Sequence, residues 1–89
     1  MSYELDDLAR DLRALLEMSV TTKAELRAWD RLALRVQSDI HSNPAVSNLV
    51  PHGLWHYFSD ADIRMEDPEY ARAQCALTRE FLTKLAERR

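Results

Sequence analysis

Turn-forming residues are scarce in this chain of 89 residues, which contains one glycine and three prolines. This scarcity disfavours a fold of many short strands and favours long helices. A single glycine also excludes a glycine-rich phosphate-binding loop. The one cysteine excludes an internal disulfide bond and is typical of a protein from a reducing compartment.

Long apolar runs are missing as well. No segment approaches the roughly 20 apolar residues that a membrane span requires, and the acidic N-terminus lacks the apolar core of a signal peptide. We therefore expect a cytoplasmic protein with no membrane partner. With 46% hydrophobic and 30% charged residues, the chain is too apolar to be disordered, and its length predicts a single helical domain over residues 1–89.

Two long helices are predicted in the first half of the chain. Ser2 is the predicted N-cap of the first helix, and Thr22 and Glu25 fit a capping box at the start of the second. Two such helices joined by a short loop predict an antiparallel hairpin. Their apolar stripes have helical spacing and consist of Leu5, Leu8, Leu12 and Leu15, then Leu26, Trp29, Ala33, Val36 and Ile40.

The middle of the chain differs from the rest, because residues 40–59 contain no Asp, Glu, Lys or Arg. Asn43 and Pro44 predict a helix start. Pro51 precedes a predicted short helix over residues 52–58, and Ser59 fits a weak capping box for a further one. This part of the chain is therefore predicted to be a connection made of short helices.

A long C-terminal helix is predicted to begin with Asp67 as its N-cap and Pro68 as its first residue. Its wide apolar arc predicts contact with two neighbours, either two helices of this chain or one helix and a second subunit. The arc consists of Tyr70, Ala71, Cys75, Leu77, Phe81, Leu82 and Leu85. The predicted fold is thus an all-α bundle of two long antiparallel helices, a short-helix connection and a long C-terminal helix.

His52 and His56 are candidate metal ligands. On a helix they lie one turn apart on the same face, from which both imidazoles can bind one ion. Asp60 or Asp62 is a potential third ligand, although a new helix after Ser59 would take Asp60 off the histidine face. The alternative is that both histidines cap helix ends or bond to backbone carbonyl groups.

A broader interpretation of the same segment is a small-molecule pocket. Pockets are mostly apolar with a few convergent polar groups, and this segment offers both. The alternative is that the aromatic residues close the open end of the helical hairpin as part of the core. The candidate ligand-binding residues are His52, Trp55, His56, Tyr57, Asp60, Asp62 and Arg64.

Basic residues recur every four positions along the second helix. This basic ribbon (Lys23, Arg27, Arg31 and Arg35) suits contact with phosphate groups, or ion pairing with Glu4, Asp7 and Asp11 of the first helix. The chain has 15 acidic and 12 basic residues, a net charge of −3. Phosphate binding requires a basic footprint, so the charge favours ion pairing over nucleic-acid binding.

The sequence shows no catalytic constellation. Cys75 has neither a helix N-terminus nor a base nearby in the chain, so it is interpreted as a structural thiol. This favours a non-enzymatic protein without a cofactor.

The leading hypothesis for function is a protein–protein interaction module, such as a small regulator, an inhibitor or an assembly subunit, whose partner is another protein or a second copy of the chain. Its interface candidates are Trp55, Phe58, Cys75 and Leu82. A protein that binds a metal or small ligand around His52 and His56 is the alternative. Nucleic-acid binding through the basic ribbon is a third.

Overall fold

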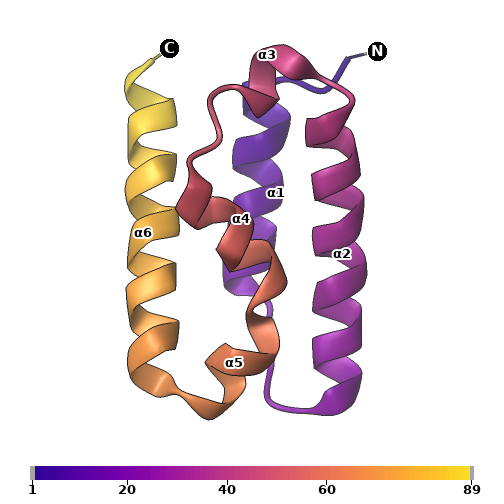
Figure 1. The fold of residues 1–89 in the computed structure, drawn as a ribbon, viewed down its shortest axis with the longest axis vertical. Helices are drawn as coiled ribbons and strands as arrows, with labels where there is room; N and C mark the ends of the chain where they lie inside the picture. Colours follow the sequence, from indigo (N-terminus) through magenta and orange to yellow (C-terminus); the bar gives the residue numbers. More distant parts are fainter. Residues whose placement is uncertain (1, 89) are drawn as a thin grey trace.

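The computed structural model describes residues 2–88, and within them the chain forms six α-helices and no strand (Figure 1). The predicted all-α fold is confirmed. The helices are α1 (Leu5–Glu17), α2 (Lys23–His41), α3 (Pro44–Ser47), α4 (His52–Ser59), α5 (Ala61–Glu66) and α6 (Pro68–Glu87). No helix in the described part of the chain is long and apolar enough to cross a membrane.

The helices are arranged as four columns that run alternately in opposite directions (Figure 1). α4 and α5 follow one another as a single broken column, and α2 and α6 each contact this column on one side and α1 on the other. α3 closes the end at which α1 begins and α6 ends. The predicted short-helix connection is therefore itself one column of the bundle.

The core lies between the columns and uses the predicted apolar stripes. α1 contributes three buried leucines, and α2 contributes the residues from Trp29 to Ile40 that recur with helical spacing. α4 contributes Leu54, Tyr57 and Phe58. The wide apolar arc of α6 is explained by three neighbours within the chain, namely α1, α4 and α5. The largest buried side chains are Leu8, Leu12, Leu15, Trp29, Val36, Ile40, Leu54, Tyr57 and Thr78.

Two of the predicted helix starts are confirmed by their hydrogen bonds. The backbone N–H of Glu25 donates to Thr22 Oγ1 at 3.1 Å, and the N–H of Thr22 donates to Glu25 Oε1 at 3.1 Å, which completes the capping box. At the start of α6, the N–H of Tyr70 donates to Asp67 Oδ1 at 3.1 Å. These bonds satisfy amide groups that a helix start leaves without partners.

The predicted cap at Ser2 is wrong. α1 begins after Glu4, whose N–H donates to Asp7 Oδ2 at 2.9 Å. The N-cap is therefore Glu4, two residues after the predicted Ser2, and the side chain of Asp7 accepts the bond at this helix start.

The predicted caps at Asn43 and Ser59 also act on other groups. Pro44 begins α3 as predicted, but Asn43 Nδ2 donates to Asp39 O at 2.7 Å, at the end of α2. Ser59 Oγ donates back to Trp55 O and His56 O, so it closes α4 and does not cap α5. In both cases the side chain bonds back to carbonyl groups near the end of the preceding helix.

Candidate ligand site

A cavity of about 180 Å³ lies at the end of the bundle where α1, α5 and α6 meet the loop between α1 and α2. Among the residues around it within the described chain, Arg64 carries the only charge. The lining residues are Leu15, Leu16, Met18, Val20, Trp29, Tyr57, Ala61, Arg64, Met65, Ala71 and Cys75. The cavity is thus apolar with one cation in its wall.

The Arg64 guanidinium group is held in place by two aromatic rings and two neutral acceptors. Its Cζ lies 4.7 Å from the centre of the Trp29 ring and 4.3 Å from that of the Tyr57 ring. Its Nη1 donates to Tyr57 O at 2.7 Å and to Gln74 Oε1 at 2.6 Å. The ring faces attract the cation, so Arg64 has a fixed position at the cavity wall.

No carboxylate within residues 2–88 forms an ion pair with Arg64, and its Nε and Nη2 have no acceptor among these residues. Burial lowers the pKa of Arg64, but an arginine stays protonated in proteins. Two donor nitrogens of a fixed cation therefore lack an acceptor among residues 2–88.

A polar network between α4, α5 and α6 positions Gln74, the neighbour of Arg64. Gln74 Nε2 donates to Asp60 Oδ2 at 3.2 Å and to Tyr70 Oη at 2.9 Å. Tyr70 Oη donates to Asp60 Oδ2 at 2.5 Å. This hydrogen bond lowers the pKa of Asp60 and raises that of Tyr70. Because its Nε2 is occupied in this way, Gln74 presents Oε1 to Arg64.

The structure divides the predicted ligand-binding residues into groups that do not share one pocket. Tyr57 and Arg64 line the cavity, whereas Asp60 belongs to the network behind it. Trp55 is half-buried and stacks on His41, with 4.9 Å between ring centres and 11° between planes. Asp62 is exposed on α5.

His52 and His56 lie on the exposed side of α4, and their Nε2 atoms are 3.1 Å apart. Within residues 2–88, no third His, Cys, Asp or Glu joins them in a group that could hold a metal ion. Neither Asp60 nor Asp62 therefore completes the predicted three-ligand set.

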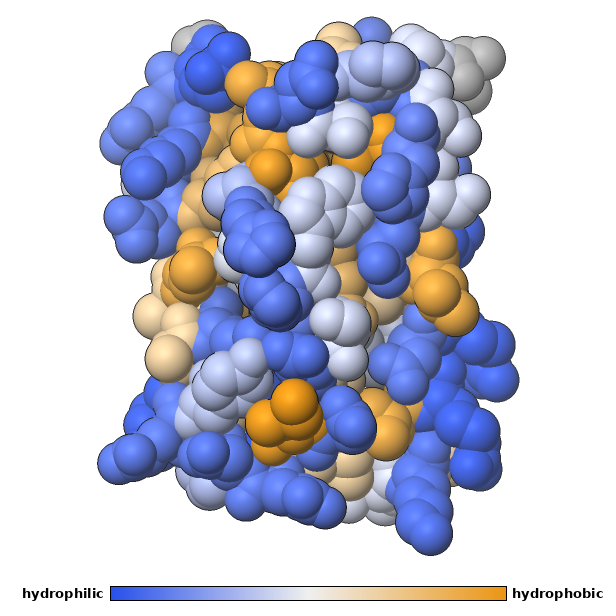
Figure 2. All heavy atoms as spheres, viewed as in Figure 1, coloured by the Kyte–Doolittle hydropathy of each residue, from blue (hydrophilic) through white to orange (hydrophobic). Residues whose placement is uncertain are grey.

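The interface candidates are mostly taken up by the packing of the chain itself. Phe58 is buried in the core, while Trp55, Cys75 and Leu82 are half-buried against it. The large exposed hydrophobic residues are Leu34, Ile63, Met65 and Leu77, from three different helices. On the face shown in Figure 2, hydrophobic residues occur in separate patches between hydrophilic ones.

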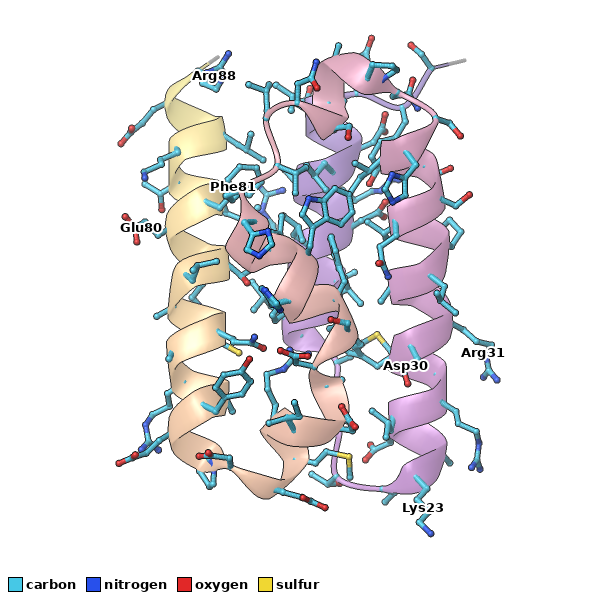
Figure 3. All side chains as sticks on the ribbon, viewed as in Figure 1. Lys23, Asp30, Arg31, Glu80, Phe81 and Arg88 are labelled. Carbon is cyan, nitrogen blue, oxygen red and sulfur yellow. The ribbon has the colours of Figure 1, made fainter. Side chains whose placement is uncertain are left out.

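The basic ribbon of α2 is only partly paired with α1. Arg35 Nη1 lies 2.9 Å from Asp11 Oδ2, as the pairing hypothesis predicts. Arg27 and Arg31 are exposed and make no ion pair with any residue in the described chain. Figure 3 shows Lys23 and Arg31 pointing away from the bundle.

Sequence reasoning found Arg64 and Tyr57 but missed Trp29 and Gln74, which hold the guanidinium group from two other columns. Helical periodicity places Trp29 only in the core stripe of the second helix, and Gln74 belongs to none of the predicted motifs. The sequence does offer a signal for Gln74, which is a polar residue within the apolar arc of the last helix. Such a residue is expected to be buried and to need a hydrogen-bond partner, and the structure shows that Gln74 is buried.

Comparison with known proteins adds no further constraint: no family model, no curated protein and no solved structure matches this chain.

Proposed function

We propose that the protein is a non-enzymatic binding protein that takes a small apolar carboxylate into the cavity beside Arg64. The observation that carries the proposal is a fixed arginine without a carboxylate partner in the wall of an otherwise apolar cavity. An apolar pocket with a few placed polar groups is the usual form of a small-ligand site.

Arginine favours a carboxylate ligand because its planar donors match the two oxygens of that group. Arg64 Nη1 is occupied by Tyr57 O and Gln74 Oε1, which leaves Nε and Nη2, two neighbouring donors on one edge of the guanidinium group. A bound carboxylate would also supply the negative charge that Arg64 lacks. The class of ligand is thus set by the charge and shape of one side chain.

The size of the cavity limits the apolar part of the ligand. A cavity of about 150 Å³ in another protein holds one benzene molecule, and this one measures about 180 Å³. Met18 and Met65 lie in its wall, and methionine adapts its shape readily. We therefore expect one aromatic ring or a short aliphatic chain.

Benzoate and benzyl alcohol form a matched pair of probes, because they share the ring and differ in charge. Hydrogen bonds to charged groups contribute about 1.5–3 kcal/mol, so benzoate should bind at least about tenfold more tightly by isothermal titration calorimetry. Benzoate should also slow the alkylation of Cys75, the single cysteine, which lines the cavity.

Two variants locate the binding site. Arg64→Gln is expected to remove the preference for benzoate, while Arg72→Gln, at an exposed position of α6, should keep it. Equal affinity for the two probes in the wild-type protein, or a preference for benzoate that survives in Arg64→Gln, would refute the proposal. The first of these results does not depend on whether a variant folds.

The protein–protein interaction module is a second proposal, supported by α5. Ile63 and Met65 on this short helix are 46% and 36% exposed, and Met65 also lines the cavity. Exposed apolar side chains around a pocket suit an anchor residue of a partner protein. Native mass spectrometry and pull-down with the Ile63→Ser variant as the matched control would test this proposal.

A further inference from the structure

The strongest feature outside the cavity is the pair of histidines on α4. The Nε2 atoms of His52 and His56 are 3.1 Å apart, and the ring centres are 4.7 Å apart with 82° between their planes. Both side chains are exposed. Without an ion, this contact requires one ring to donate a proton and the other to accept it.

The separation of the two nitrogens also matches that of two ligands on one metal ion. Imidazole nitrogen lies about 2.0–2.1 Å from zinc. An ion at that distance from both Nε2 atoms would form a nitrogen–metal–nitrogen angle of roughly 95–100°, between octahedral and tetrahedral values. The separation of the two nitrogens therefore already fits a shared ion.

The surroundings of the pair admit a cation. No Lys or Arg occurs between residues 40 and 59, so α4 itself carries no positive side chain other than the histidines. Asp60 follows α4 directly and interacts electrostatically with His56. α4 lies on the face turned to the viewer in Figure 1, and its two histidine side chains are exposed.

We propose that His52 and His56 bind one divalent transition-metal ion, with water in the remaining coordination positions. Imidazole suits zinc, nickel and copper, whereas magnesium and calcium prefer oxygen ligands. The ion replaces the proton that the two rings share. The positions filled by water distinguish this site from a closed structural zinc site, which has four protein ligands.

The test is calorimetric titration of the full chain with Ni²⁺ and, separately, Zn²⁺. The wild-type protein should bind one ion per chain. Loss of an outer-shell partner alone costs about 10–100-fold in metal affinity, so His52→Ala and His56→Ala should each weaken binding at least tenfold. Both substitutions lie on an exposed helix face and introduce a good helix former, so the fold should survive.

His41→Ala and Cys75→Ser are the controls, because they remove the third histidine and the only thiol. Both should keep the wild-type affinity. As a second measurement, Ni²⁺ should raise the Tm of the wild-type protein but not that of His56→Ala, and a chelator should reverse the shift. Equal metal affinity in the wild type and His56→Ala, or equal loss in His41→Ala, would overturn the proposal.

Discussion

Arg35 and Arg64 are both held by several partners, yet their surroundings differ in one respect. Arg35 bonds to two carboxylates: Nη1 lies 2.9 Å from Asp11 Oδ2 and 3.0 Å from Asp39 Oδ2, and Nη2 donates to Asp11 Oδ1 at 3.2 Å. Arg64 bonds only to neutral oxygens and packs on two rings. Arg35 is therefore neutralised by direct ion pairs, whereas Arg64 forms no direct ion pair with a carboxylate of residues 2–88.

Asp11 explains why the Arg35 network is structural. Its side chain is buried between α1 and α2, where it accepts bonds from Tyr3 and Arg10 as well as Arg35. Burial raises the pKa of Asp11, but these hydrogen bonds outweigh burial and lower it. Arg35 thus stabilises the fold by pairing with a buried carboxylate, whereas Arg64 lies beside an apolar cavity without such a pair.

The largest expected effect on stability comes from Arg35→Met. It leaves Asp11 buried without its main cation, and breaking a fully buried ion pair costs about 3–5 kcal/mol. Because the Arg35 side chain is 47% exposed, solvent screening reduces the expected loss in free energy of unfolding to about 2 kcal/mol. Urea denaturation measures this loss. Arg31→Met, an exposed position on the same helix without an ion pair, should stay within about 0.5 kcal/mol of wild type.

A smaller loss, about 1 kcal/mol, is expected for Arg64→Met. Methionine keeps apolar contact with the rings of Trp29 and Tyr57, and only neutral acceptors lose their partner. The same denaturation series measures it. A loss as large as that of Arg35→Met would mean that Arg64 is mainly structural, which would remove the contrast between the two arginines.

Much of the fold followed from local signals. The leucine stripe of α1, the capping box at Thr22 and the proline after Asp67 correctly predicted the long helices, because caps and helical periodicity act within a few residues. The predicted cap at Ser2 is wrong because the side chain of Asp7 accepts the bond from the Glu4 N–H at this helix start. The packing of α4 and α5 as a single column also depends on contacts with α2, which is separated from them in sequence by α3 and its flanking loops.

The candidate site was predictable only in part for the same reason. Arg64 and Tyr57 are close in sequence, and both belong to the predicted ligand-binding residues. The rest of the site depends on the meeting of distant segments: Trp29 comes from α2, and Met18 and Val20 from the loop before it. The sequence spacing alone predicts that His52 and His56 lie on the same face of one helix. The 3.1 Å between their nitrogens depends on side-chain conformations, which the sequence does not specify.

The smallest expected effect is the pH dependence of stability that arises from Tyr3, next to the Arg35 network, and Tyr57, next to Arg64. The pKa of Tyr3 is raised by burial and by its hydrogen bond to Asp11, and burial is the main cause that raises the pKa of Tyr57 to about 12. A pKa raised by folding contributes stability below about pH 10 that is lost as the pH rises towards 12, because the unfolded chain loses its proton first. Denaturation between pH 9 and about 12 should therefore show falling stability.

Tyr57→Phe isolates the part of this fall that belongs to the cavity. The bond from Arg64 goes to the backbone oxygen of Tyr57 and phenylalanine keeps the ring face, so stability at neutral pH should change by less than about 1 kcal/mol. The loss of stability at alkaline pH should become shallower than in the wild type, and an unchanged slope would contradict the assignment.

Benzoate bound beside Arg64 would place a carboxylate near Tyr57, as Asp11 lies near Tyr3. Tyrosinate absorbance of the wild type should then appear at a higher pH with benzoate than with benzyl alcohol, and Tyr57→Phe should abolish that difference.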